Sequence, residues 1–177
     1  MKSRLLTLLA GLFLLAAGSA SAQSRDPYFS TFSANYDVIY HETDATSNAG
    51  AHFDVASTFK RDVPFIGPVG EVGFNHFNLA PPADGVTIVS VMGGVRIRPG
   101  NDRQFLPYGQ VLVGLYHCGA CDINDFAIQG AGGVDFRLSD NNSFRIRTQL
   151  DVRHVFEPSF GFNAVRLSVG IVFPLNK

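Results

Sequence analysis

The chain has no tryptophan, only two cysteines and two methionines among 177 residues, and its 14 basic and 15 acidic residues nearly cancel. Such a balance gives no electrostatic footprint for nucleic acid. After residue 22, no apolar run approaches the ~18 residues that a transmembrane helix needs, and no useful stretch repeats apolar residues at helical spacing. The chain has instead 16 phenylalanines, 5 tyrosines and 18 glycines. Aromatic and glycine enrichment without helical periodicity predicts an all-β protein.

The first 22 residues have the three parts of a secretory signal peptide. Lys2 and Arg4 form a positive start, Leu5 to Ala17 are apolar, and residues 20–22 (Ala-Ser-Ala) fit a small-residue cleavage site. The alternative, an uncleaved anchor, is disfavoured because the apolar segment is too short to span a membrane as a helix. We therefore predict a signal peptide (1–22) followed by one domain (23–177). Cleavage would remove two basic residues and change the net charge from −1 to −3.

The two cysteines, Cys118 and Cys121, lie three positions apart in the stretch His-Cys-Gly-Ala-Cys-Asp. Outside the cytoplasm this spacing predicts a local disulfide bond that fixes a loop. A redox site would need a thioredoxin-like βαβ pattern, and a c-type haem site would need a histidine after the pair, whereas His117 precedes it. Two thiolates and His117 leave a zinc site one ligand short. The five histidines show no metal-binding spacing, so no metal or cofactor is expected.

The stretch Ser143 to Val155 alternates strictly from Phe144 onward. Even positions 144–152 carry Phe, Ile, Thr, Leu and Val, while odd positions 145–153 carry Arg, Arg, Gln, Asp and Arg. A period of two predicts a β-strand with two unlike faces. The charged face would point to water in a soluble sandwich, or into a polar lumen in a transmembrane barrel.

Similar alternation occurs seven more times, and turn-forming residues such as Pro99 to Asp102 separate the segments. The predicted strands have about 9 to 13 residues, close to the ~9–11 that a tilted strand needs to cross a membrane and longer than in most soluble domains. We therefore predict an eight-stranded antiparallel up-and-down transmembrane β-barrel. The predicted strands cover residues 30–41, 49–60, 69–77, 86–98, 105–117, 126–138, 144–155 and 162–173.

The cost of arginine in lipid decides which face lies inside. One arginine at the membrane midplane costs ~2–4 kcal/mol, so three on one strand would cost roughly 6–12 kcal/mol, comparable with the stability of a typical domain. Charged side chains should therefore point inward, pair with one another and plug a lumen that is only wide enough for side chains. The predicted lumenal charge network comprises Asp37, Asp54, Glu71, Arg96, Asp135, Arg137, Arg145, Arg147, Asp151, Arg153 and Arg166, with Arg98 also on the inward face.

Three segments carry a resemblance to a known family: FLPYGQVLVG (105–114), FAIQGAGGVDFRLSDNNSFRIRTQLDVRH (126–154) and VRLSVGIVFPLNK (165–177). They resemble the outer-membrane β-barrel proteins, akin to the transmembrane domain of outer-membrane protein A and the opacity proteins. The resemblance implies location in the outer-membrane lipid, insertion by an assembly machinery, both termini in the periplasm, and outward-facing loops after the first, third, fifth and seventh strands. Many relatives end in an aromatic residue, whereas here four residues follow Phe173.

Four functions remain open. The first is a structural or surface-interaction role, in which the loops, above all the cysteine loop, contact an extracellular partner. The second is a narrow pore for small solutes, selective for anions if the lumenal arginines lined an open channel. The third is a lipid-modifying enzyme such as a deacylase, suggested by His154, Glu157 and Ser159; three polar residues at a strand end need no chemistry, so we predict no catalytic residues. The fourth, a soluble periplasmic barrel that binds an apolar ligand, would require the apolar face inside.

Overall fold

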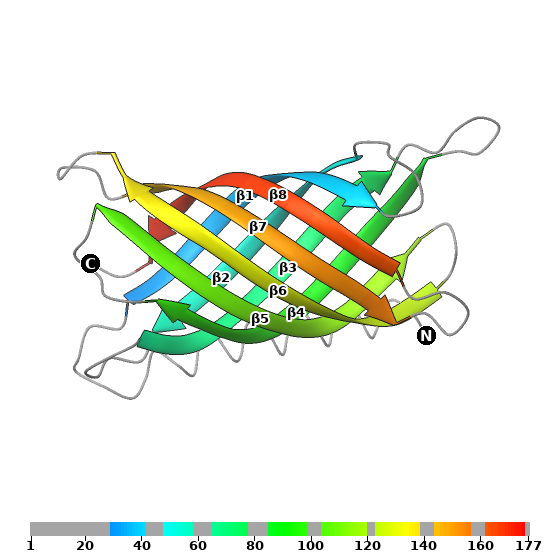
Figure 1. Cartoon of the computed structure of the whole chain (residues 1–177), viewed down its shortest axis with the longest axis horizontal. Coiled ribbons are helices and arrows are strands. Elements are labelled where there is room, and N and C mark those ends of the chain that lie inside the picture. The colour runs from blue at the N-terminus through cyan, green and yellow to red at the C-terminus, as the bar shows by residue number, and fades with distance from the viewer. Residues whose placement is uncertain are drawn as a thin grey trace.

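Eight antiparallel strands close into a barrel in the computed structural model, which describes residues 29–41, 48–58, 65–77, 85–98, 104–119, 123–138, 144–156 and 162–175 (Figure 1). Each strand pairs with the next, and β1 pairs with β8, which confirms the predicted up-and-down barrel. The strands are β1 (Phe29–His41), β2 (Asn48–Thr58), β3 (Phe65–Phe77), β4 (Val86–Arg98), β5 (Phe105–Cys118), β6 (Ile123–Arg137), β7 (Arg145–Phe156) and β8 (Phe162–Pro174).

Closure between the first and last strands removes the edges of the sheet. The β1–β8 ladder runs from Thr31↔Pro174 to His41↔Ala164. Within lipid, an unpaired backbone group costs several kcal/mol because no water can replace the lost hydrogen bond. A closed sheet is therefore the way in which strands can cross a bilayer. The described residues contain no helix long and apolar enough to cross a membrane.

The start of β3 differs from the prediction. Gly67 and Pro68 indicate a turn in the sequence, but β3 already begins at Phe65. The ladder between β2 and β3 ends at Ala56↔Val69, one residue after the proline, whereas Pro68 is paired with Val95 on the β4 side. Pro68 thus lies just beyond the end of the β2–β3 ladder, at a position that tolerates a missing N–H group.

The start of β6 is also earlier than predicted, since the cysteine loop was expected to extend to Asp125. Residues 123–125 instead pair with residues 116–118 at the end of β5. Asn and Asp indicate a loop in the sequence, but here they have partners in the sheet: Asn124 Oδ1 lies 2.8 Å from His117 Nδ1. Asp125 is buried on the inward face. Pairing across the hairpin therefore overrides the local turn preference.

The two faces of the barrel have inverted polarity. Val111, Leu150 and Val169 are each more than 50% exposed on the outside, whereas Glu71 and Arg147 are completely buried inside. An apolar exterior around a charged interior suits lipid and not water. The structure thus confirms the predicted orientation, and the soluble ligand-binding barrel, which needs apolar residues inside, is wrong.

Part of the lumen is apolar. A cluster of inward-facing side chains on the middle strands packs among the polar groups, and Met92 and Leu112 are almost completely buried there. The cluster consists of Ala56, Val69, Ile88, Met92, Leu112, Tyr116, Ala127 and Val155. Apolar side chains fill space that the ion pairs leave, so the barrel interior is packed like a protein core.

Candidate functional site

The lumenal charge network forms two clusters, of which the first is held by Arg147 on β7. Its guanidinium makes a bidentate contact with Asp135 on β6, with Nε–Oδ1 2.7 Å and Nη2–Oδ2 3.0 Å, and donates to Asp54 Oδ2 on β2 at 2.5 Å. Arg98 Nη2 lies 2.8 Å from Asp135 Oδ2, and Arg96 Nη1 lies 3.1 Å from Asp54 Oδ1. This first cluster therefore joins three arginines to two aspartates across four strands.

Tyr108 on β5 forms the centre of the first cluster. The guanidinium carbons of Arg96 and Arg147 lie 4.6 and 4.7 Å from its ring centroid, within the range of cation–π attraction. Its hydroxyl donates a hydrogen bond to Gln149 Oε1. Gly133 on β6 makes room for the ring, because a Cβ atom there would lie 2.6 Å from Tyr108 Cζ.

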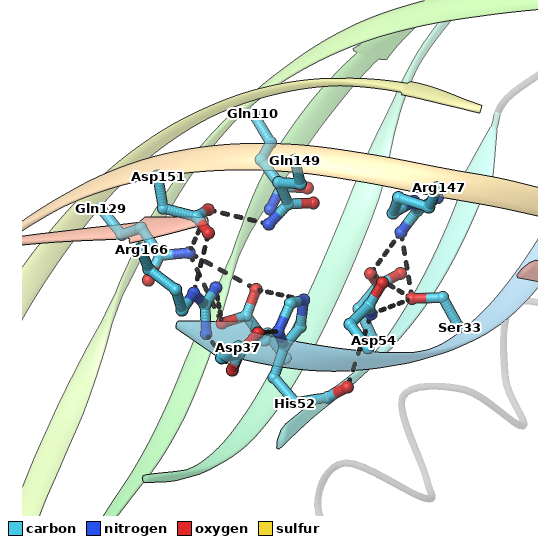
Figure 2. A network of polar contacts seen from close by, with 12 residues as sticks. Ser33, Asp37, His52, Asp54, Gln110, Gln129, Arg147, Gln149, Asp151 and Arg166 are labelled. Atoms are coloured by element: carbon cyan, nitrogen blue, oxygen red, sulfur yellow. Dashed lines mark hydrogen bonds and ion pairs between the residues drawn. The ribbon is translucent and has the colours of Figure 1, made fainter. Parts of the chain in front are cut away.

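The second cluster surrounds Arg166 on β8, as Figure 2 shows. Its Nε lies 2.8 Å from Asp151 Oδ2, its Nη2 lies 2.7 Å from Glu71 Oε1, and its Nη1 lies 3.5 Å from Asp37 Oδ2. His52 Nδ1 lies 2.7 Å from Asp37 Oδ1. One guanidinium thus connects carboxylates from β1, β3 and β7.

Two glutamines extend the second cluster. Arg153 Nη2 donates to Gln129 Oε1 at 2.7 Å, and Gln129 Nε2 donates to Asp151 Oδ1 at 3.0 Å. Gln149 Nε2 also donates to Asp151 Oδ1, at 2.8 Å. Because Gln149 accepts from Tyr108 as well, it links the two clusters into one network.

The charges of the network balance only when the clusters are taken together. The first cluster has three arginines and two carboxylates, and the second has two arginines and three carboxylates, apart from His52. The first cluster therefore has an excess of one positive charge and the second an excess of one negative charge, and the two cancel across the lumen. The arrangement is suited to bracing strands and leaves no carboxylate without a cationic partner in these clusters.

Nine predicted network residues lie within the two clusters: Asp37, Asp54, Glu71, Arg96, Asp135, Arg147, Asp151, Arg153 and Arg166, together with Arg98. Arg137 and Arg145 lie outside both clusters and face each other in the β6–β7 ladder near the end where β7 begins. The uncharged linkers Tyr108, Gln129 and Gln149, and also His52, did not enter the predicted network. Their inward positions in the alternation are the sequence signal for them, although they carry no formal charge.

A small cavity of about 10 Å³ lies inside the barrel beside the second cluster, lined by residues that include Asn75, Tyr116 and Arg153. That volume is comparable with the space one water molecule needs. The amide oxygen and nitrogen of Asn75 are buried without a hydrogen-bond partner in the structure. In the described part of the lumen, side chains rather than a wide channel occupy the space beside this cluster.

The three polar residues at the end of the seventh predicted strand and the two cysteines lie only partly within the described residues. His154 faces outward, with Nδ1 2.8 Å from Asn163 Oδ1, while Glu157 and Ser159 lie outside the described residues. Cys118 is buried at the end of β5, but Cys121 also lies outside the described residues, so the disulfide stays a prediction. Within the described ranges, no three His, Cys, Asp or Glu side chains are grouped so that they could hold a metal ion.

Comparison with known proteins gives matches in structure only. No protein-family model and no curated protein matches the sequence. Among solved structures, Neisserial surface protein A has a TM-score of 0.65 and 9% identity, over 86% of this chain and 100% of that chain. The outer membrane enzyme PagL has a TM-score of 0.54 and 9% identity, over 81% and 99%. Ail of Yersinia pestis, in complex with the heparin analogue sucrose octasulfate, has a TM-score of 0.52 and 14% identity, over 84% of this chain and 100% of that chain.

These proteins differ from the chain at most sequence positions and share its architecture. The identities are too low to transfer an activity, a ligand or a residue role. The shared features are the number, order and closure of the strands, which the chain combines with an apolar exterior and buried charges. The chain is a transmembrane β-barrel with the eight-stranded fold of outer-membrane proteins.

Proposed function

We propose that the protein is a small integral outer-membrane protein with a structural or surface-interaction role and a closed lumen. The observation that carries the proposal is the buried network, in which Arg147 and Arg166 each connect carboxylates from different strands. The apolar exterior suits the membrane, and the buried ion pairs hold the strands together. The loops that join the strands are then the parts that meet other molecules.

A pore is the less favoured alternative. Arginines that select anions would need to face open water, whereas those of the two clusters form ion pairs with carboxylates at 2.5 to 3.7 Å. Removing one partner of a buried ion pair typically costs about 3–5 kcal/mol, so the network resists opening. The cavity of about 10 Å³ beside it is far below the size of a solute channel.

We also infer that the protein is not an enzyme. PagL is an enzyme, so the fold by itself does not decide the matter. The lumenal acids and bases of the two clusters are buried and form ion pairs with one another. General acid or base chemistry needs such groups within reach of a substrate. Glu71, for example, is completely buried and lies 2.7 Å from Arg166.

Export and assembly complete the proposal. The pattern of residues 1–22 supports export and cleavage, and the outer-membrane fold supports insertion by the outer-membrane assembly machinery. The spacing of Cys118 and Cys121 supports a disulfide-bonded loop as a contact element for an extracellular partner. The mass of the mature protein under non-reducing conditions tests both processing steps: it should correspond to residues 23–177 and be two hydrogens lighter than the reduced chain.

Membrane fractionation, gel mobility and conductance test the main proposal. The full chain should fractionate with the outer membrane and change its gel mobility on heating, and the purified protein should give no steady conductance in a planar bilayer. A reproducible unit conductance from protein with heat-modifiable mobility would support the pore instead. Recovery in the soluble periplasmic fraction would contradict the membrane proposal altogether.

A further inference from the structure

Three outward-facing histidines share one arrangement. His76, His117 and His154 lie one or two residues before the ends of β3, β5 and β7. Each is paired in the ladder with a polar residue on the next strand, respectively Thr87, Asn124 and Asn163. The Nδ1 atoms lie 3.1, 2.8 and 2.8 Å from the partner side-chain oxygens. Three of the hairpins therefore repeat the same device at the same end of the barrel, opposite the end where β1 begins and β8 finishes.

The histidines lie at the border of the apolar belt. On β5 the outward positions from Phe105 to Leu115 carry apolar residues or glycine, and His117 is the next outward position. Ten residue steps at ~3.3 Å, with a strand tilt of ~40°, rise about 25 Å, the height of the apolar band of a membrane barrel. His117 therefore falls at the level where hydrocarbon gives way to lipid headgroups.

Among the described outward residues, the neighbours of each histidine carry no charge. Each histidine also has a neighbour on the preceding strand: Ala49 on β2 lies beside His76, Val89 on β4 beside His117, and Ile128 on β6 beside His154. Across the described strands, no outward position carries Lys, Arg, Asp or Glu. The three imidazoles are thus the ionisable nitrogen groups on the described outer surface.

The hydrogen bonds leave the second ring nitrogen for another partner. A carboxamide oxygen only accepts, so Nδ1 of His117 and of His154 donates to its asparagine. Nε2 is then the position that gains a proton when the ring becomes charged. Histidine changes charge between about pH 5 and 8, and a charged ring donates from both nitrogens.

We infer that His76, His117 and His154 form a girdle that binds the phosphate groups of lipid headgroups through protonated Nε2. The histidine girdle rests on the proposed function, because it requires the barrel to stand in a bilayer. The phosphate supplies the negative charge that the described outer surface lacks. Charge complementarity at the hydrocarbon border points to a lipid headgroup phosphate as the occupant.

Solid-state NMR of the full chain in phosphatidylcholine bilayers tests the girdle directly. With ¹⁵N-labelled histidine, ³¹P should dephase the Nε2 signals of the three girdle residues at pH 5.5 and much less at pH 8. Phosphatidylcholine is zwitterionic, so a surface potential cannot imitate the effect. His52, completely buried in the lumen, is the internal control and should show no dephasing.

Substitutions assign the signals and separate the outcomes. H76Q, H117Q and H154Q should each remove one dephased signal. Heat-modifiable mobility of the same samples shows whether the barrel has inserted. An inserted barrel without dephasing at pH 5.5 would overturn the girdle and leave the proposed function standing, whereas failure to insert would overturn both. Dephasing by inorganic phosphate in maltoside micelles, but not by the bilayer, would indicate an ion site and overturn the lipid assignment.

Discussion

Arg147 shows at the residue scale how one side chain holds distant strands together. It bonds to Ser33, Asp54 and Asp135, which lie on β1, β2 and β6. The separation from Ser33 is 114 residues in sequence. Its loss is costly because Asp54 and Asp135 are buried, and each would keep only one of its two arginine partners, Arg96 and Arg98 respectively.

Substitution of Arg147 by methionine should lower the free energy of unfolding by about 3–5 kcal/mol, since Asp54 and Asp135 lose a buried partner. Urea unfolding in lipid vesicles, followed by gel mobility and circular dichroism, measures the loss. Arg137→Met is the matched control, because Arg137 is only half-buried and lies outside both clusters. An equal loss in the two variants would contradict the assigned role of the network.

Gly133 gives a second prediction at this scale. A Cβ atom at this position would lie 2.6 Å from both Tyr108 Cζ and the Thr148 carbonyl oxygen. Gly133→Ala should therefore cost about 1–3 kcal/mol by overpacking. Gly130→Ala, on the same strand, has nothing within 4 Å of the new methyl and should be nearly neutral. Unfolding midpoints of the two variants, compared under identical conditions, decide the matter.

Alternation is the property that matters at the scale of the strand. Along β7, residues 145–156 change from buried to exposed or half-buried at every step. Because the side-chain period is two, one face meets lipid along the whole strand. The position of a residue along that face then decides how much a charge costs.

Leu150→Arg should cost about 2–4 kcal/mol, since the side chain is 52% exposed on the outside of β7, near the middle of the strand. Less protein should then reach the heat-modifiable form during refolding into vesicles. Leu138→Arg, just beyond the end of β6, should cost about 0–1 kcal/mol, because an arginine there reaches the polar interface. If both variants inserted equally well, the membrane level assigned to Leu150 would be incorrect.

Closure is decided by the whole molecule. Residues Thr31 to His41 pair with Pro174 to Ala164, so the last strand completes the sheet on the first. A chain without β8 would leave β1 and β7 with unpaired backbone groups in lipid. The barrel should therefore form as one cooperative unit.

Truncation after Phe156 should abolish refolding in detergent micelles. The shortened chain should show no heat-modifiable mobility and no compact form in gel filtration. A chain that ends at Pro174 keeps every β1–β8 pair and is the control, which should refold like the full chain. A compact, heat-modifiable product from the shorter chain would show that closure is not required.

Much of the architecture follows from the local sequence of each strand. Strand number, strand length and the inward set of charges follow from alternation, because each residue's face depends only on its place in its own strand. The early start of β3 at Phe65 did not follow, since Pro68 is acceptable only where the β2 ladder has ended. Ile123 to Asp125 likewise joined β6 because β5 supplies their partners.

The sequence by itself determined that the charged face lies inside, because three arginines in hydrocarbon would cost a free energy comparable with the stability of a typical domain. Tertiary structure alone decided which acid meets which base. Arg166 and Asp37 are 129 residues apart, and they meet because the strand order and register around the closed barrel bring them to the same level. The uncharged linkers Tyr108 and Gln149 follow the same rule: their inward position is local, but their contact depends on the curvature that closes the sheet.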